Sequence, residues 1–220
     1  MFLTVFEVEL PFYNKLKKKR QLVIESQNNI EDLILNMQKN NEIPKEKVKE
    51  IILILDVRNS TQLLKTSGEY AFVTMLENFQ TILTKTLKLS KGNLIKIMGD
   101  EVIIFFSYSE DLFDFLKKFN EFLYRYNSNL TEKYLSINIS AAATIGELIK
   151  TTTNEFLGSA LNLCVRLIAN AKTNEILISE ELYDNLSDFL KNNFNIQKNK
   201  TELKGFGTIV FYSLNYKNVR

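Results

Sequence analysis

The chain alternates apolar runs with amphipathic stretches, and this alternation predicts a fold of mixed strands and helices. Residues 51–56, IILILD, form a continuous apolar run that ends in an acid. Such a run is typical of a central strand whose C-terminal end opens onto a site. Residues 60–89 then have helical spacing, and Ser60 or Thr61 is expected to cap the start of this helix.

The next segment, NLIKIMGDEVIIFFS at 93–107, has the pattern of a β-hairpin. Two apolar runs flank a Gly-Asp pair, and Gly99 can supply a backbone conformation that other residues resist. Asp100 at the tip of this hairpin gains chemical interest only if a second carboxylate lies close to it.

The remaining pattern completes an α+β fold. It predicts a helix at 110–126, two strands within 134–150, a helix at 159–172, a strand at 174–179, a helix at 180–190 and a terminal hairpin at 194–214. The order βαββαβ, followed by further elements, predicts a ferredoxin-like sheet with its helices on one face. Residues 1–47 differ in pattern and are expected to form an N-terminal strand and helix appendage to a main domain at 48–216.

Composition narrows the possible chemistry. The chain has 220 residues and no histidine, which excludes a Ser-His-Asp triad and removes the commonest ligand of transition metals. Any reaction must therefore depend on Asp, Glu, Lys, Arg, Asn and bound ions. The single cysteine, Cys164, lies among apolar neighbours and is expected to be a small buried side chain, so no disulfide is expected.

The charge and the lengths of the apolar runs bear on partners and location. A net charge of +2 is too small to indicate nucleic-acid binding, and the basic run at 15–20 is expected to be a solvated helix face. No apolar run approaches the length that crosses a membrane, and the first residues lack the order of a signal peptide. We therefore expect no membrane partner and a cytoplasmic location.

Two acids are the first candidates for chemistry. In a ferredoxin-like sheet, Asp56 at a strand end and Asp100 at the hairpin tip come from adjacent central strands. Two such anions repel by several kcal/mol unless they are protonated or neutralised by a cation. With oxygen ligands and no histidine, the cation expected is Mg²⁺ or Mn²⁺. The start of the following helix offers N–H groups and the Thr61 hydroxyl to a triphosphate.

A second group of polar residues lies on and around the helix at 159–172. Asn162 and Arg166 are one turn apart and share a face, and Glu155 precedes the helix. An amide and a guanidinium on one face can bind a ribose oxygen and a phosphate, and Lys204 in the terminal hairpin can add a positive charge. Taken one at a time, these residues are better explained by a locally packed Asn162 and by solvated side chains of Arg166 and Lys204.

Taken together, four segments resemble the catalytic domain of the class III nucleotide cyclases, the family of adenylate and guanylate cyclases. The segments are LDVRNST at 55–61, IKIMGDE at 95–101, EFLGSALNLCVRL at 155–167 and ELKGFG at 202–207. The resemblance covers about residues 49–214, in the order and approximate spacing of the family.

The resemblance implies conversion of a nucleoside triphosphate to a 3′,5′-cyclic nucleotide and pyrophosphate in a head-to-tail homodimer. Two ions, Mg²⁺ or Mn²⁺, would be held by Asp56, Asp100 and Val57. Asn162 would orient the ribose, Arg166 would stabilise charge on the α-phosphate, and Lys204 would hold the terminal phosphates. The phosphate cradle would consist of the backbone from Val57 through Asn59, Ser60 and Thr61.

The resemblance also bears on the base. Lys96 matches the base-selecting lysine of the family, and Glu155 falls where cyclases that make cyclic AMP commonly have Asp. One donor and one acceptor suit a ring nitrogen beside an amino group, which adenine and cytosine both have. The longer acid at Glu155, Asn59 in place of a common glycine, and the alanine-rich 140–146 depart from the family pattern.

Several interpretations stay open from the sequence. ATP is slightly favoured as the substrate. The stand-alone bacterial pyrimidine cyclases that make cyclic CMP or cyclic UMP in anti-phage defence are also similar. Two further alternatives are a catalytically silent, cyclase-like dimerisation domain and a ferredoxin-like polymerase or cyclic-dinucleotide synthase, although the Asn/Arg helix and the lysine hairpin argue against a polymerase or synthase.

Overall fold

The computed structural model describes residues 46–132 and 134–215. The expected appendage lies outside the described residues except for its last two positions, which belong to the first strand. The strands are β1 (Glu46–Val57), β2 (Asn93–Met98), β3 (Glu101–Phe106), β4 (Ile139–Lys150), β5 (Phe156–Leu157), β6 (Glu175–Ser179), β7 (Gln197–Leu203) and β8 (Gly207–Asn215). The helices are α2 (Ser60–Ser67), α3 (Glu69–Lys88), α4 (Ser109–Ser128), α5 (Ser159–Ile168), α6 (Glu180–Asp184) and α7 (Asp188–Asn193).

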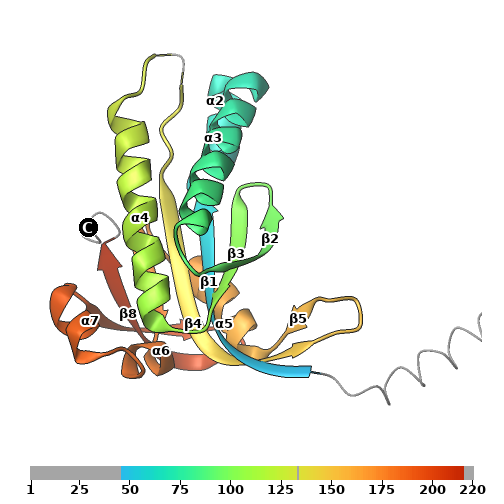
Figure 1. Ribbon diagram of the computed structural model, residues 1–220, viewed down its shortest axis with the longest axis vertical. Helices are drawn as coiled ribbons and strands as arrows, with labels where there is room; N and C mark the ends of the chain where they lie inside the picture. Colours follow the sequence, from blue (N-terminus) through green and yellow to red (C-terminus); the bar gives the residue numbers. More distant parts are fainter. Residues whose placement is uncertain (1–45, 133, 216–220) are drawn as a thin grey trace, which may run out of the picture. The chain divides into compact units, whose positions relative to one another are not determined.

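The strands form one sheet in the order β2-β3-β1-β4-β6-β8-β7, with β5 paired to β4 (Figure 1). Within the first four strands, β2-β3-β1-β4, each strand is antiparallel to its neighbours, and the order is that of a ferredoxin-like core, which confirms the predicted βαββαβ fold. β6 pairs with β4 in parallel and joins the terminal hairpin of β7 and β8 to this core. The hairpin tip at Gly99 has φ 67°, as the sequence predicted.

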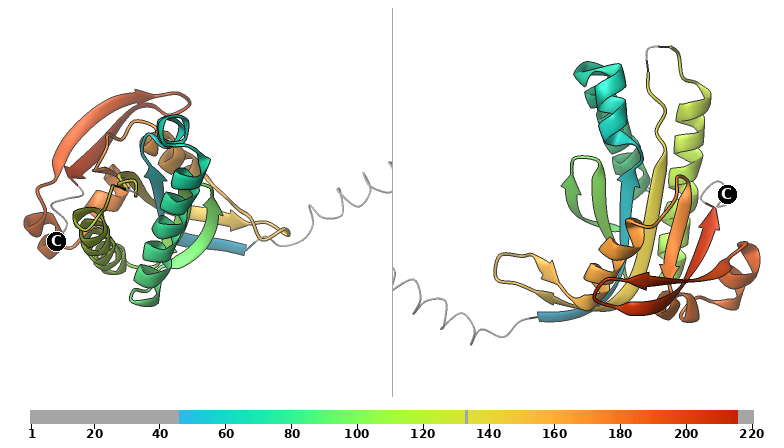
Figure 2. Two further views of the ribbon diagram at one scale, coloured as in Figure 1. Left: turned by 90° about the horizontal axis from the view of Figure 1, so that it is seen from above. Right: turned by 180° about the vertical axis from the view of Figure 1, so that it is seen from behind.

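Strand β1 separates two apolar layers because its side chains alternate between the faces of the sheet. Ile51, Leu53, Leu55 and Val57 pack with α3 and α4, whereas the even-numbered isoleucines pack with α5. In Figure 1, α3 and α4 lie in front of the sheet, and α5 is seen in front from the opposite side (Figure 2). The expectation of helices on one face is therefore wrong for α5, although it holds for α3 and α4.

The helix expected over 60–89 is two helices, because the chain breaks at Gly68. Gly68 has φ 81° and ψ 163°, far from helical values, and it ends α2 and begins α3. The residue before α2 is Asn59 in the left-handed conformation, at φ 60°, and no side chain caps the helix. The predicted capping by Ser60 or Thr61 is therefore wrong; a position that needs positive φ suits asparagine better than most residues.

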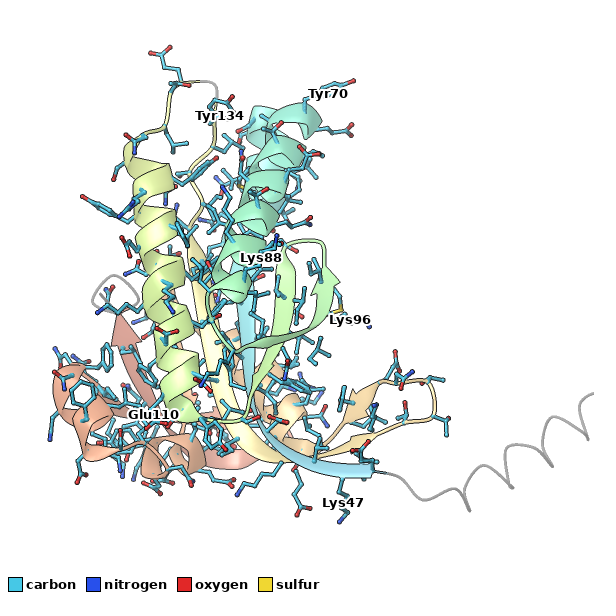
Figure 3. The ribbon with its side chains drawn as sticks, viewed as in Figure 1. Lys47, Tyr70, Lys88, Lys96, Glu110 and Tyr134 are labelled. Atoms are coloured by element: carbon cyan, nitrogen blue, oxygen red, sulfur yellow. The ribbon has the colours of Figure 1, made fainter. Side chains whose placement is uncertain are left out.

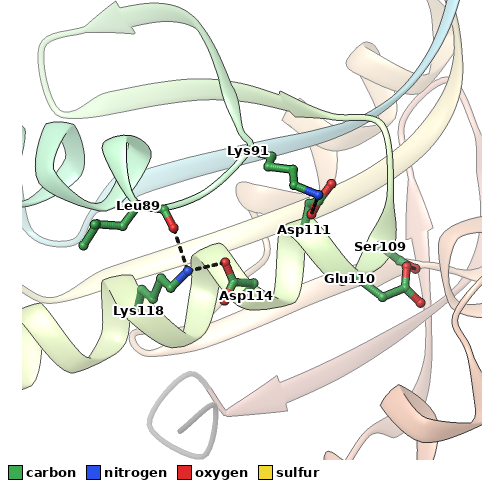
Figure 4. Close-up of polar contacts among 7 residues, drawn as sticks. All are labelled: Leu89, Lys91, Ser109, Glu110, Asp111, Asp114 and Lys118. Carbon is green, nitrogen blue, oxygen red and sulfur yellow. Dashed lines mark hydrogen bonds and ion pairs between the residues drawn. The ribbon is translucent and has the colours of Figure 1, made fainter.

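The end of α3 is fastened to α4 by polar contacts at the protein surface (Figure 4). The Lys118 ammonium donates to the carbonyl of Leu89, at 2.6 Å, and bonds to Asp114 one turn earlier on its own helix. Lys91 forms an ion pair with Asp111 near the start of α4, at 3.5 Å. A cation beside the last carbonyls of α3 also interacts favourably with the helix dipole.

The pair of strands expected within 134–150 is one strand, β4. Its only glycine, Gly146, lies inside the strand, at the point where α5 approaches closely. A Cβ at Gly146 would lie 2.7 Å from the Cβ of Ala160. Ala141, Ala142 and Ala143, all fully buried, complete a run of small residues, which accounts for the departure at 140–146.

Two further helix boundaries differ from the expectation. The helix expected over 180–190 is divided into α6 and α7, with Ser187 in an extended conformation at φ −65° and ψ 154°. This division lets Leu182, Leu186 and Leu190 all reach the core. α5 ends at Ile168 rather than at residue 172, and it buries Cys164 completely. Burial raises the pKa of the Cys164 thiol to about 12, so the expected role as a small buried side chain is confirmed.

Candidate active site

Three carboxylates gather where β1 ends beside the β2–β3 hairpin. The backbone N–H of Val57 donates to the carbonyl of Asp100 at 3.1 Å, which joins the two segments that carry the predicted acids. Glu101 lies opposite Asp56 in the β1–β3 register, so its side chain shares the face of Asp56. Asp56 and Asp100 therefore come together, as predicted, and Glu101 is a third acid beside them.

The electrostatics of this cluster are unfavourable to negative charge. Burial raises the pKa of Asp56, the neighbouring Arg58 opposes that shift, and the charge of Asp100 adds to it. Burial also raises the pKa of Glu101, and the charges of Asp56 and Asp100 raise it further. A cation at the cluster would offset both effects.

Arg58 is the cation that the chain itself supplies. Its Nη1 lies 3.4 Å from an Asp56 carboxylate oxygen, and the two side chains are only 22% and 25% exposed. Its Nη2 donates to the carbonyl of Ile168 at 2.8 Å and to that of Ala171. The guanidinium therefore connects the end of β1 with the C-terminal end of α5.

The donor set at this cluster fits a hard divalent cation. All three acids offer oxygen, the donor that Mg²⁺ and Mn²⁺ prefer. In the described ranges, no three acids or thiols converge closely enough to hold an ion by themselves. Mg²⁺ commonly takes one or two carboxylates and completes its shell with water and substrate phosphates. Two polar atoms near Asp56, Arg58 Nε and Ser140 Oγ, are buried with no hydrogen-bond partner among the described atoms.

The predicted phosphate cradle is only partly available. The N–H of Val57 is bonded to Asp100, and the N–H of Arg58 is bonded to the carbonyl of Asn138. Residues 59–61 lie at the start of α2, where N–H groups lack partners within the helix. Any N–H donors for a phosphate therefore come from Asn59, Ser60 and Thr61 rather than from Val57.

Helix α5 carries Asn162 and Arg166 on an exposed face. Both side chains are exposed, and they lie one turn apart, as predicted. The opposite face buries Ala160, Cys164 and Leu167 against β1 and β4. Since the buried face fixes the helix, the amide and the guanidinium project away from the sheet.

Lys96 and Glu155 are brought together although 59 positions separate them. The Lys96 ammonium lies 4.0 Å from a Glu155 carboxylate oxygen, and the side chains are 54% and 65% exposed. Lys96 lies on the edge strand β2, at the outer side of the hairpin (Figure 3). The backbone of Glu155 is held by Thr151, whose hydroxyl accepts its N–H at 3.0 Å. The predicted donor and acceptor are therefore neighbours.

Lys204 lies in the three-residue turn between β7 and β8, where it is exposed. Within the described ranges, no hydrogen bond or ion pair joins Lys204, Asn162 or Arg166 to the carboxylate cluster. A groove of about 740 Å³ between α5 and the β7–β8 hairpin is lined by residues such as Ser159, Leu163 and Thr208 and by none of the predicted site residues. One chain alone thus leaves the predicted site in separate parts.

The sequence pattern missed Arg58 and Glu101 as members of the cluster. Both have a local signal: Arg58 is two positions after Asp56, in the turn that directly follows β1. Glu101 is next to Asp100 and directly follows the hairpin turn. The contacts of Arg58 with Ile168 and Ala171, which lie 110 and 113 positions away, have no signal in the sequence.

The comparisons with known proteins agree with the fold. Residues 43–216 match the model of the adenylate and guanylate cyclase catalytic domain. Among proteins with curated functions, none matches the chain. In residues 46–132 and 134–215, no helix has both the length and the apolar character needed to cross a bilayer.

Solved structures of several cyclases share the fold. The guanylyl cyclase Cya2 has a TM-score of 0.68 at 17% identity, over 78% of this chain and 94% of its own. The adenylyl cyclase CyaB from P. aeruginosa has a TM-score of 0.61 at 20% identity, over 78% of this chain and 96% of its own. The core of a rhodopsin-guanylyl cyclase with converted specificity, in complex with ATPalphaS, has a TM-score of 0.65 at 19% identity, over 78% and 98%.

Proposed function

The chain belongs to the adenylate and guanylate cyclase catalytic domain family, and we propose that it converts a nucleoside triphosphate to a 3′,5′-cyclic nucleotide and pyrophosphate. The observation that carries the proposal is the junction of β1 with the β2–β3 hairpin, where Asp56, Asp100 and Glu101 meet. In the reaction the ribose 3′-oxygen bonds to the α-phosphorus, and the bond from that phosphorus to the oxygen that bridges it to the β-phosphorus breaks. Pyrophosphate leaves with the bridging oxygen, and the proton of the 3′-hydroxyl passes to solvent.

Asp56 and Asp100 would hold two ions, Mg²⁺ or Mn²⁺, together with the carbonyl of Val57. Bound there, the ions would neutralise phosphate charge and favour ionisation of the ribose 3′-hydroxyl. The raised pKa values of Asp56 and Glu101 support a cation at this position, since both carboxyls lose solvation in the fold. Arg58 keeps Asp56 oriented through their ion pair.

The exposed residues would bind the nucleotide. Asn162 would orient the ribose, Arg166 would stabilise the charge that develops on the α-phosphate, and Lys204 would hold the terminal phosphates. The N–H groups at 59–61 supply further donors at the start of α2. Phosphoryl transfer depends mostly on positioning and charge neutralisation, so this set is sufficient without histidine.

We propose that a head-to-tail homodimer assembles these parts. The carboxylate cluster and the exposed face of α5 have no contact with each other in one described chain, so a second copy is the simplest source of the missing half. Two-fold symmetry then creates two equivalent sites, each with carboxylates from one subunit and Asn162, Arg166 and Lys204 from the other. One structurally similar protein is described as a non-canonical dimeric guanylyl cyclase domain.

The pair of Lys96 and Glu155 favours a base with a ring-nitrogen acceptor beside an amino group. Lys96 donates to the ring nitrogen, and Glu155 accepts from the amino group, which fits ATP. The same pair fits cytosine, and this observation makes CTP the second candidate. Cyclic CMP as the product would support the pyrimidine branch, including a role in anti-phage defence. Solved cyclases of both purine specificities share the fold, so the fold does not select the base.

The experiment that tests this function is incubation of the purified full chain with ATP, GTP, CTP or UTP, each with Mg²⁺ or Mn²⁺, and identification of products by mass. We expect cyclic AMP as the main product. Cyclic CMP would keep the reaction and change the base. No cyclic product from any nucleotide would favour the silent, cyclase-like domain.

A paired variant sharpens the base assignment. Glu155→Gln keeps the length of the side chain and replaces a pure acceptor with a group that also donates. We expect it to lower kcat/KM for ATP by about 10-fold, since one misplaced polar contact commonly costs about 1–3 kcal/mol. Glu147→Gln, an exposed change on β4, is the control and should leave kcat/KM unchanged.

A further inference from the structure

The guanidinium of Arg58 contacts two parts of the fold that come from distant segments. On one side it pairs with Asp56 at the end of β1, at 3.4 Å. On the other side its Nη2 donates to the carbonyls of Ile168 and Ala171. Only 22% of the Arg58 side chain is exposed, so these contacts lie largely out of water.

The two carbonyls lie at and just beyond the C-terminal end of α5. Ile168 is the last residue of this helix, and the N–H of Ala171 bonds back to the carbonyl of Ile168 at 3.1 Å. Carbonyls at a helix C-terminus have no partner within the helix and carry partial negative charge. A cation with several donors satisfies them and anchors the end of the helix.

Helix α5 is also the element that presents Asn162 and Arg166. Its first turn is fixed by close packing of Ala160 against Gly146 and by the bond from the Thr144 hydroxyl to the Ala160 carbonyl, at 2.9 Å. Its last turn is fixed by Arg58. The direction of the exposed face therefore depends on both ends.

We propose that Arg58 is a positioning residue that ties the Asp56 carboxylate to the C-terminal turn of α5. The importance of this contact rests on the proposed function, because one chain then supplies two half-sites, the carboxylate cluster and the exposed face of α5. Arg58 connects these two half-sites. In a head-to-tail dimer, Asp56 of a chain serves one site, and Asn162 and Arg166 of the same chain serve the other. Arg58 is thus a physical connection between the two sites.

The chemistry of the contact requires arginine. A guanidinium is planar and presents five N–H donors in a fixed fork, so it can bind a carboxylate through one nitrogen and carbonyls through another. A lysine ammonium is a single point of charge, so it would bind either the Asp56 carboxylate or the carbonyls at the end of α5, but not both equally well. The substitution Arg58→Lys would therefore preserve the charge while loosening the connection.

The decisive experiment is amide hydrogen exchange of the full chain without nucleotide or divalent ion. The reporters are the amides of Asn170 and Ala171, which bond to the carbonyls of Leu167 and Ile168. The variants are Arg58→Ala, Arg58→Lys, Asp56→Asn, Asp100→Asn and the double variant Asp56→Asn with Arg58→Ala. Asp100→Asn is the matched control, because it removes a nearby charge that is not ion-paired with Arg58. Core amides of β3 report any general loss of stability.

We expect Arg58→Ala to accelerate exchange at the two reporters by about 10-fold or more relative to β3, and Arg58→Lys by a smaller factor. Asp56→Asn should accelerate it several-fold, Asp100→Asn should have no effect, and Asp56→Asn should add nothing once Arg58 is absent. Equal effects of Asp56→Asn and Asp100→Asn would overturn the proposal. Unchanged exchange at the reporters in Arg58→Lys would also overturn it. Because Arg58→Lys retains the positive charge, it keeps the test available if Arg58→Ala fails to fold.

A kinetic measurement gives the functional side of the same proposal. A displaced α5 should lower kcat of Arg58→Lys by about 10-fold with little change in KM for the nucleotide, since every side chain proposed to bind the nucleotide is unchanged. The exchange experiment needs no turnover, so a failure of the proposed function would be seen in the product assay alone. If Arg58 does not anchor α5, the exchange rates of the reporter amides will show it even if the chain is an active cyclase.

Discussion

The carboxylate end of β1 and the exposed face of α5 differ in how far one chain fixes their side chains. Asp56 is about three-quarters buried, bonded to Arg58, and flanked by strands on both sides. Asn162 and Arg166 are exposed, and Lys96 and Glu155 meet only at 4.0 Å in solvent. Asp56 is therefore held in place in the single chain, while the exposed amide and basic groups need another surface to restrict them.

The largest loss of activity is expected from a substitution in the carboxylate cluster. Asp100→Asn should reduce turnover by about 100-fold or more, because it removes a carboxylate that would hold the proposed ions, and with them the neutralisation of phosphate charge. The variant should keep its melting temperature, since the lost charge only repels Asp56 and Glu101. Product formation and thermal denaturation check these outcomes. Asp184→Asn, on the exposed surface of α6, is the control, and full activity of Asp100→Asn would contradict the metal assignment.

A substitution on the exposed face of α5 should give a similar loss of activity, which a second subunit with an intact α5 can partly restore. Arg166→Ala should lower kcat by about 100-fold without loss of stability, because the side chain is exposed and its proposed role is to stabilise charge during the reaction alone. Random mixing of this variant with Asp100→Asn makes half of the dimers mixed, each with one intact site of two. We therefore expect about a quarter of the original activity to return. No recovery on mixing would contradict the shared site.

A change beneath α5 tests the support of the exposed half. Gly146→Ala puts a Cβ 2.7 Å from that of Ala160, and overpacking of this kind costs about 1–3 kcal/mol of the free energy of unfolding. Urea denaturation should show this loss, and turnover should fall because the helix moves. Adding Ala160→Gly restores the space and should recover activity, although a helical glycine costs about 1 kcal/mol. If the double variant recovers neither turnover nor the free energy of unfolding, close packing is not the cause of the loss.

The smallest effect is expected from pH. The pKa values of Asp56 and Glu101 are raised in the folded chain, so above the ordinary Glu101 value of 4.5 the folded chain binds more protons than the unfolded chain. The free energy of unfolding must then decrease as the pH rises through this window. Glu101→Gln removes one such group, so between about pH 4.5 and 7 its melting temperature should fall less than that of the original chain, by at most a few degrees.

This pH measurement is made without divalent ions, and Glu202→Gln, exposed on β7, is its control. If Glu101→Gln and the original chain keep the same difference in melting temperature at every pH, the raised pKa of Glu101 does not contribute to stability. A divalent ion added to the original chain should reduce the pH dependence, since it stabilises the ionised carboxylates.

The parts of this structure that the sequence predicted are those determined by short-range pattern. The apolar run before Asp56, the Gly99 turn and the alternating elements led to the ferredoxin-like core without any distant contact. The side of the sheet that α5 covers was not predictable in this way, because both faces of β1 are apolar. The roles of two glycines also depend on the fold: Gly146 permits close approach of a helix, whereas Gly68 interrupts one.

The residues of the candidate site also divide into those that a local pattern predicts and those that depend on contacts between distant segments. Asp56, Asp100, Asn162 and Arg166 were predicted because each occupies a recognisable local position, while the double contact of Arg58 joins segments that only the folded chain brings together. The capping of α2 was predicted wrongly for a related reason. The position before the helix requires positive φ, and that requirement arises from how the chain leaves β1.

Strand β1 has a consequence for the evolution of this chain. Its odd and even residues contact different apolar layers, and Asp56 is its last even-numbered residue. Deletion or insertion of one codon within 51–55 would exchange the two layers and turn the acid toward α3 and α4. Lineages should therefore tolerate substitutions between branched apolar residues in this segment but almost never a change of its length by one.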